Sequence, residues 1–189
     1  MTQVKTRRSQ AFSTRTLAYC ALLAALSVVL ARLIIPMPDS STRFSIEQVP
    51  IFLAGMLFGP LAGAMVGFAA DFVGCLFSGY GYNPLFCLPP ILYGLAGGLY
   101  APIFGSKIDP LRLSAVFLPP VIIGSVLYQS VALAWVYYNT TFLEGLQLKL
   151  TTRSIQFAIT AVIDIVIFLL LFKARIFDRM GLWPRKQNK

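Results

Sequence analysis

One apolar stretch near the end of the chain constrains its fold more than any other feature. Residues 155–172 form a largely apolar run in which Asp164 is the only ionisable side chain. As an α-helix, these eighteen residues would cover about 27 Å, which is close to the thickness of the hydrocarbon core of a bilayer. We therefore expect this segment to cross a membrane.

Five further apolar segments precede this one and predict a six-helix bundle. We expect them at residues 17–35, 50–58, 61–77, 86–104 and 113–137, with Gly59-Pro60 as a turn between the second and the third. Residues 139–152 contain several polar side chains and are expected to form a loop before the last helix. Prolines inside the later segments are compatible with membrane helices, in which neighbouring groups satisfy the freed carbonyls.

The composition agrees with a location in lipid. Of the 189 residues, 57% are hydrophobic and 12% are charged, which leaves too little polar surface for a soluble globule of this size. We expect an all-α integral membrane protein with one six-helix transmembrane domain at residues 17–173. A basic N-terminal segment at residues 1–16 and a basic tail at residues 174–189 flank this domain.

The distribution of the 16 Lys and Arg residues predicts the orientation of the chain. Twelve of them lie before the first span, after the last span, or in the polar connection at residues 105–112. In a six-helix chain these three regions share one side, and the positive-inside rule identifies that side as the cytoplasm. We expect both termini to be cytoplasmic. The basic residues left for the outer half are Arg32, Arg43, Lys149 and Arg153.

Several classes of protein are excluded by motifs that the sequence lacks. It contains no GxxxxGK[ST] phosphate-binding loop, no histidine, and no pair of cysteines at the spacing of metal ligands. Cys20, Cys75 and Cys87 lie in apolar runs, as small core residues do. The basic residues cluster beside hydrophobic spans, which indicates orientation and not nucleic-acid binding. We expect no enzymatic activity, no metal, no cofactor and no nucleic-acid partner.

Two acidic residues lie deep in the predicted helices and are candidate functional groups. Asp71 falls in the third span and Asp164 in the sixth. Burying an ionisable side chain in a membrane costs free energy, so such residues often mark a substrate or proton pathway. The alternative is a structural role, in which each carboxyl group bonds to a hydroxyl or backbone group of a neighbouring helix.

The outer basic residues indicate a binding site for an anion. Arg32 and Arg153 fall at the outer ends of helices, where an unpaired charge is unfavourable. Snorkelling to the interface, or pairing with Asp39, Glu47 or Glu144, would account for any one of them. As a set of four beside loops rich in Tyr and Asn, they suit an anionic ligand, because Arg binds carboxylates through paired hydrogen bonds.

Aromatic residues border the same outer loops. They are Phe44, Tyr80, Tyr82, Phe86, Trp135, Tyr137 and Tyr138. An interfacial aromatic belt and stacking against a flat ligand are equally compatible with this placement.

Glycines recur at every fourth position across the second and third segments, at Gly55, Gly59, Gly63 and Gly67. Such overlapping GxxxG patterns let helix backbones approach each other closely. We therefore expect a close helix contact or a tight helix-turn-helix here, and not ligand chemistry.

Motifs between residues 43 and 86 carry a resemblance to a known family. In chain order they are Arg43, Ser45, Pro50-Ile51, the stretch Leu53-Ala54-Gly55-Met56-Leu57-Phe58-Gly59-Pro60, Gly63, Gly67, Ala70-Asp71, Gly74 and Tyr82-x-Pro84-x-Phe86. Here the chain resembles the folate-family substrate-binding (S) components of energy-coupling factor (ECF) vitamin transporters. Other vitamin S components have similar Gly-Pro-x-x-Gly stretches, so the combination with Arg43 and the Tyr-x-Pro-x-Phe loop makes the match specific.

The resemblance implies a multi-pass subunit of a bacterial plasma membrane that captures one vitamin molecule from outside. It would contact membrane lipid and dock on a separate energising module, made of an ECF transmembrane coupling protein and two ATPase subunits. A chain without a phosphate-binding loop needs such an outside energy source. In the first helix Ala21-x-x-x-Ala25 matches the family's small-residue docking motif, and Ala18 lies on nearly the same face.

Folate, or a related anionic vitamin, suits the residues of the expected site. The chain departs from the family's pattern at Glu47, Gln48 and Asn83, which are polar and could satisfy donors and acceptors on a pterin edge. The glutamyl carboxylates of folate suit an arginine, and its rings would stack on Phe or Tyr. The residues expected to bind substrate are Arg32, Arg43, Phe44, Glu47, Gln48, Asp71, Tyr82, Asn83, Phe86, Trp135 and Arg153.

Three alternatives stay open on sequence grounds. An S component for another vitamin, such as pantothenate, would share most of these features. A structural membrane scaffold would also lack enzyme motifs, but it gives no reason for four outer basic residues among aromatics. An intramembrane enzyme using Asp71 and Asp164 would need both carboxylates in one water-filled site.

Overall fold

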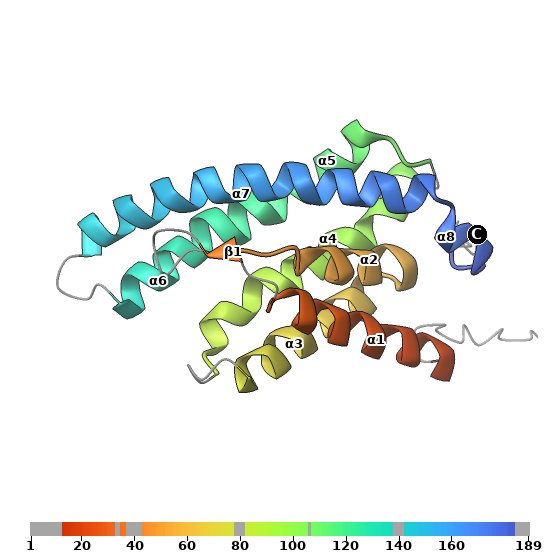
Figure 1. The fold of residues 1–189 in the computed structure, drawn as a ribbon, viewed down its shortest axis with the longest axis horizontal. Helices are drawn as coiled ribbons and strands as arrows, with labels where there is room; N and C mark the ends of the chain where they lie inside the picture. Colours follow the sequence, from red (N-terminus) through yellow and green to blue (C-terminus); the bar gives the residue numbers. More distant parts are fainter. Residues whose placement is uncertain are drawn as a thin grey trace, which may run out of the picture.

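The computed structural model describes residues 13–32, 35–36, 43–77, 82–105, 107–137 and 142–183, with the backbone alone at residues 35, 36, 43, 44, 137, 178 and 179. Within these ranges the chain is mostly helical, with two short strands and irregular connections between the elements (Figure 1). The elements in chain order are α1 (Thr14–Leu30), β1 (Ile35–Pro36), β2 (Arg43–Phe44), α2 (Gln48–Phe58), α3 (Pro60–Leu76), η2 (Pro84–Cys87), α4 (Leu88–Phe104), α5 (Pro110–Pro120), η3 (Val121–Tyr128), α6 (Gln129–Tyr137), α7 (Phe142–Lys173) and α8 (Ile176–Arg179).

All six expected apolar segments contain helices. The first three correspond to α1, α2 and α3, the fourth to η2 with α4, and the fifth to α5, η3 and α6, which follow one another without a break. By length and composition, Pro84–Phe104, Pro110–Val136 and Phe142–Lys173 could each cross a membrane. The shorter apolar helices are Thr14–Leu30, Gln48–Phe58 and Pro60–Leu76.

The last long helix begins earlier than its apolar run. α7 has 32 residues and starts at Phe142, so the predicted loop at residues 139–152 is wrong from that residue onward. The polar side chains that suggested a loop belong to the helix, and Lys149 among them is only 3% exposed. At 1.5 Å per residue, α7 is about 48 Å long and exceeds a hydrocarbon core of about 30 Å.

Glycines bring the backbones of α2, α3 and α4 into contact, as their spacing predicted. A side-chain carbon added to Gly55 or Gly63 would collide with the carbonyl oxygen of Gly94 on α4, and one added to Gly67 would collide with the carbonyl of Pro90. Gly59 turns the chain between α2 and α3 with a φ of 104°, which L side chains rarely adopt. These contacts place α2 inside the bundle, where ten of its eleven residues are buried.

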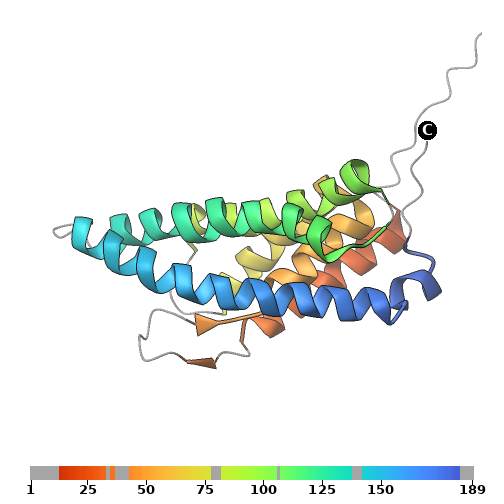
Figure 2. The same cartoon turned by 90° about the horizontal axis from the view of Figure 1, so that it is seen from above.

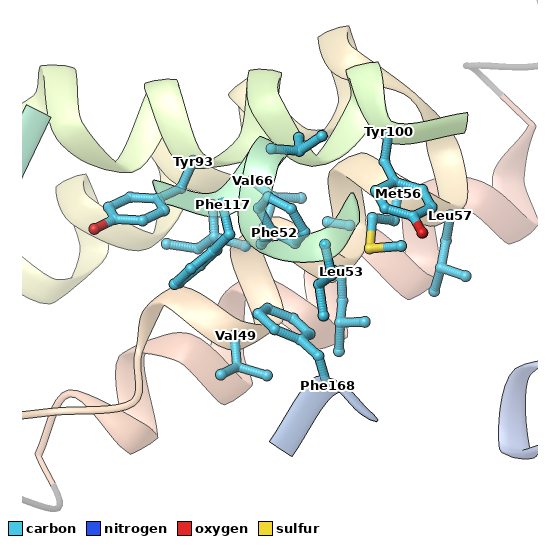
Figure 3. Close-up of a cluster of buried hydrophobic side chains, with 14 of the residues drawn as sticks. Val49, Phe52, Leu53, Met56, Leu57, Val66, Tyr93, Tyr100, Phe117 and Phe168 are labelled. Carbon is cyan, nitrogen blue, oxygen red and sulfur yellow. The ribbon is translucent and has the colours of Figure 1, made fainter. Parts of the chain in front are cut away.

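A cluster of aromatic rings fills the core between α2, α4, α5 and α7 (Figure 3). The ring of Phe52 lies 5.2 Å from that of Phe117 and 5.0 Å from that of Phe168, measured between centroids. Tyr93 joins the cluster at 5.5 Å from Phe117. Such edge-on and tilted pairs add to the stabilisation that the buried ring area provides.

The two described ends of the chain lie at the same end of the bundle. In Figure 1 the start of α1 and the short helix α8 lie at one end, whereas α6 ends and α7 begins at the other. A guanidinium nitrogen of Arg15 lies 3.5 Å from the carbonyl oxygen of Met180. Trp183 is buried beside Tyr100 and Phe172, so the segment after α7 folds back and packs against the core.

A small hairpin follows α1 at the opposite end from α8. β1 and β2 are antiparallel, with Ile35 opposite Phe44 and Pro36 opposite Arg43. The backbone of β2 contacts α7, and Figure 2 shows the pair of strands beside that helix.

Candidate functional site

A stripe of polar side chains runs along one face of α7. Lys149, Arg153, Gln156, Thr160 and Asp164 are separated by four, three, four and four residues, which places them on one side of a helix. All five are buried, with exposed fractions of 1% to 7%. This stripe, called here the α7 polar stripe, therefore faces the interior.

The opposite face of α7 is apolar and exposed. Its large exposed side chains include Ile155, Ile159, Val162 and Val166. A helix with apolar residues outside and polar residues inside is arranged for lipid, because the bundle interior is where charged groups find partners in a membrane.

Arg153 is the most firmly held member of the stripe. Its Nε donates a hydrogen bond of 3.1 Å to the carbonyl oxygen of Ser125 in η3, and a terminal nitrogen donates one of 2.7 Å to Oε1 of Gln129 on α6. Its guanidinium carbon also lies 5.0 Å from the centroid of the Phe157 ring. These contacts fix the planar guanidinium inside the bundle.

The helix that receives Arg153 has an unusual backbone. η3 is a π-helix of eight residues that begins directly after Pro119 and Pro120. Prolines cannot donate to the carbonyls four residues earlier, and π-helical turns are frequent at functional sites. In this widened segment the hydroxyl of Ser125 is 2.9 Å from the hydroxyl of Tyr93, while its carbonyl accepts from Arg153. η3 therefore joins α4 to the α7 polar stripe.

Several buried side-chain oxygens have no hydrogen-bond partner among the described residues. They include oxygens of Gln48, Asp71, Ser130 and Asp164. Such groups are rare in native structures and call for an explanation, because an unsatisfied buried acceptor costs about 1 to 3 kcal/mol. They are therefore candidate contacts for a bound molecule.

Acidic groups lie at the deeper end of the stripe. The carboxyl group of Glu47 is close enough to those of Asp71 and Asp164 to interact with both electrostatically. The backbone carbonyl of Glu47 accepts a hydrogen bond of 2.8 Å from the hydroxyl of Ser27, which fixes the start of α2 against α1. Phe168 lies one turn after Asp164 on α7 and belongs to the aromatic core, so the polar region ends at Asp164.

The predicted arginines have different environments. Arg32 is exposed at the end of α1 and donates a hydrogen bond of 2.8 Å to the carbonyl oxygen of Gly74 on α3. The side chains of Arg43 and Phe44 lie outside the described residues, although the β2 backbone that carries them contacts α7. Of the three predicted arginines, the structure places Arg153 within the buried polar network.

The predicted aromatic and amide residues lie nearer the ends of the helices. Tyr82 is partly exposed, with its ring centroid 5.3 Å from that of Phe72 on α3. Asn83 accepts a hydrogen bond of 3.1 Å from the backbone of Leu85 and caps η2. Phe86 follows in η2 and is half-buried. Trp135 is 66% exposed at the end of α6, a position typical of an interfacial aromatic.

The small residues of the first helix lie on its outer face. The side chains of Ala18, Ala21 and Ala25 are exposed. Leu23, Ala24 and Val28 pack against the core from the other side of α1. The three alanines thus form a shallow, accessible surface, called here the α1 alanine face.

Several polar residues of this network were not among the predicted site residues. They are Tyr93, Ser125, Gln129, Ser130, Gln156 and Thr160, whereas Lys149 was expected only as one of the four outer basic residues. The spacing of the polar residues on α7 was the available signal, but it begins in a stretch that was expected to be a loop. In the part of the chain that the structure describes, no three His, Cys, Asp or Glu side chains gather as metal ligands would.

Comparisons with known proteins match the chain to one family model and to several solved structures. A family model described as the S component of ECF-type riboflavin transporters matches residues 11–175. The structure of FolT bound with folic acid is similar, with 23% identity and a TM-score of 0.61 over 80% of this chain and 95% of that one. The S component of a bacterial ECF transporter is 22% identical, with a TM-score of 0.54 over 88% and 97%. No curated protein matches the sequence.

Proposed function

The chain belongs to the family of ECF-type riboflavin transporter S components, and we propose that it captures folate from outside the cell for an ATP-driven importer. Members of this family are subunits of transporters and not enzymes. The resemblance to S components noted in the sequence is thereby confirmed at the level of the family.

A pair of buried cations is the observation that carries the folate proposal. Lys149 and Arg153 lie one turn apart on α7 and are 3% and 7% exposed. Charged groups inside a membrane bundle commonly mark a substrate site, and an arginine can hold a carboxylate through two parallel hydrogen bonds. Folate carries two carboxylates on its glutamate end. We assign that end to Lys149 and Arg153, with Arg43 as a further contact from the hairpin.

The rest of the α7 polar stripe suits the remaining length of folate. Asp164 is eleven residues from Arg153, about 16 Å along the helix axis. Between them lie Gln156 and Thr160, and the aromatic core closes the region below. An elongated molecule with an anionic end, an aromatic spacer and a polar heterocycle matches this order of groups. Glu47, Gln48 and Asp71 would then lie near the heterocycle.

The proposal includes six crossings of a bacterial plasma membrane with both ends in the cytoplasm. The basic residues of the two termini and the contact between Arg15 and Met180 at one end of the bundle support this arrangement. The eleven residues of α2 rise only about 16 Å. This helix would therefore cross together with the turn at Gly59 and be enclosed by other helices more than by lipid.

Uptake would require docking on an energising module of one transmembrane coupling protein and two ATPases. The exposed α1 alanine face supports this step, because small side chains let a partner helix approach closely. Ligand binding and docking would use different parts of the molecule, since the α7 polar stripe is buried and the α1 alanine face is exposed.

Riboflavin is the second candidate, because the matching family model carries its name. Its uncharged ring system and hydroxylated chain have no carboxylate for the buried cations. Pantothenate has a carboxylate but no ring to pack against the aromatic residues. The three vitamins thus differ in which parts of the proposed site they would use.

Titration calorimetry of the purified protein with each of the three vitamins tests the proposal. We expect one folate per chain and an affinity for folate at least roughly 100-fold higher than for riboflavin, which lacks a carboxylate for two charge-assisted hydrogen bonds. Pantothenate should also bind more weakly than folate, because it has no ring to pack against the aromatic residues. Tighter binding of riboflavin or pantothenate than of folate would contradict the folate assignment and leave the family membership intact.

A further inference from the structure

Asp164 is the most deeply buried charged residue that the structure describes, and no contact in the fold explains why an aspartate is present there. Its side chain is 1% exposed, and its Oδ1 has no hydrogen-bond partner among the described residues. A purely structural aspartate in a membrane helix would be expected to bond to a neighbouring hydroxyl or amide. The unsatisfied oxygen points instead to a ligand that supplies the donor.

The surroundings of Asp164 define which part of a ligand could reach it. The hydroxyl of Tyr93 is 2.9 Å from that of Ser125, whose carbonyl accepts from Arg153, and its ring lies 5.5 Å from that of Phe117, so the tyrosine connects the outer part of the polar network with the aromatic core. One turn below Asp164, Phe168 is fully buried between Phe52 and Phe117. A molecule anchored by its anionic end at Arg153 would therefore place its far end at Asp164.

We propose that Asp164 selects the heterocycle of the ligand by accepting two adjacent N–H donors. A carboxylate presents two acceptors side by side and no donor. A pterin edge offers a ring N–H next to an exocyclic amino group, and this pair of donors matches the two oxygens. The inference rests on the proposed folate function and adds the residue that distinguishes the ring.

The same geometry disfavours a flavin ring. The corresponding edge of an isoalloxazine has an N–H between two carbonyl oxygens, so one oxygen of Asp164 would face another acceptor. Discrimination by an unmatched buried polar group is far stronger than discrimination by shape alone. Asp164 would thus exclude riboflavin while it favours folate.

Exchange of one atom provides the test. Asp164→Asn keeps the shape of the side chain but replaces one acceptor with a donor, which suits the flavin edge and not the pterin edge. We expect calorimetry to show folate affinity lowered by at least about 10-fold and riboflavin affinity raised. Binding of p-aminobenzoylglutamate, which lacks the pterin ring, should be unchanged. Unchanged binding of this fragment would also show that the variant is folded.

Asp109→Asn is the matched control. Asp109 pairs with Arg112 at 3.0 Å near the start of α5, where both side chains are about half exposed. The same chemical change there should alter neither affinity. If Asp164→Asn does not fold, the unmodified protein can be titrated with a folate analogue that lacks the pterin amino group, and we expect at least about 10-fold weaker binding.

Different results would contradict the role of Asp164 and the proposed folate-binding function. Normal folate affinity in folded Asp164→Asn, or equal affinity of the unmodified protein for folate and its amino-free analogue, would overturn the role of Asp164 alone. Failure of the unmodified protein to bind folate would overturn the proposed function.

Discussion

The guanidinium group of Arg153 on α7 donates a hydrogen bond to Oε1 of Gln129 on α6, with 2.7 Å between nitrogen and oxygen. A second nitrogen of the same group bonds to the carbonyl of Ser125. The cation is therefore held inside the bundle between two helical segments and does not turn outward, as a snorkelling arginine would. A ligand carboxylate would meet a group that is already oriented, so little conformational entropy would be lost on binding.

We expect Arg153→Lys to weaken folate binding by at least about 10-fold although the charge is kept. A lysine ammonium cannot bond to Ser125, Gln129 and a carboxylate in the planar geometry of a guanidinium. Titration calorimetry on folded protein measures the effect. Arg112→Lys, at an exposed ion pair, is the matched control and should bind normally. Full affinity in Arg153→Lys would remove Arg153 from the carboxylate site.

Arg43→Ala should also weaken folate binding by at least 10-fold, or about 1.5 to 3 kcal/mol, if the hairpin residue completes the carboxylate site. The contact of β2 with α7 brings its backbone to the helix that carries Arg153. Lys at this position should not restore full affinity. Lys173→Ala, an exposed change at the far end of α7, serves as control. Unchanged affinity of folded Arg43→Ala would remove this residue from the proposed site.

The sequence predicted the helical segments well because their apolar runs are long and their turns are marked. Gly59-Pro60 separates α2 from α3, and the repeated glycines correctly indicated contact between helices. Family membership followed from motifs in the same region and is confirmed by the family model. These features depend on local sequence, which a single chain displays directly.

The start of α7 and most of the polar network were not predicted, because they depend on which side of a helix faces the core. Lys149 lies in a polar stretch that resembles a loop when only composition is considered, whereas Arg153 was predicted as a binding residue at the outer end of the last helix. Gln129 and Ser125 become relevant through Arg153, a partner 24 or more residues away in the chain. Arg32 has the same charge as Arg153 but contacts a backbone carbonyl of α3, a difference that sequence alone does not reveal.

Gly55→Ala should destabilise the protein even though alanine favours helices. The added methyl group would collide with the Gly94 carbonyl and separate α2 from α4, and such overpacking typically costs about 1 to 3 kcal/mol. Gly74→Ala is the matched control, because open space surrounds that position and the helix propensity of alanine should act alone. Thermal unfolding in detergent compares the two variants. Equal or higher stability of Gly55→Ala would contradict the close contact.

Replacing Ala21 and Ala25 together with tryptophan should abolish uptake and leave folate affinity nearly intact. Both alanines lie on the exposed α1 alanine face, where bulky rings would keep a partner helix at a distance. Calorimetry in detergent gives affinity, and ATP-dependent uptake in vesicles reconstituted with the energising module gives transport.

The matched control for this pair is Val162→Trp with Val166→Trp, two exposed positions one turn apart on the outer face of α7. These changes should preserve both binding and uptake. Normal uptake in the alanine pair, or a parallel loss of binding and uptake, would contradict the assignment of the docking surface.

Folate is the proposed ligand of the buried site of this S component. A decisive measurement is the identity of the small molecule that remains bound when the protein is purified in mild detergent from cells supplied with mixed vitamins. Ultraviolet absorption and mass spectrometry of the released molecule identify it. We expect folate at one molecule per chain. Recovery of riboflavin, or of another vitamin in place of folate, would contradict it.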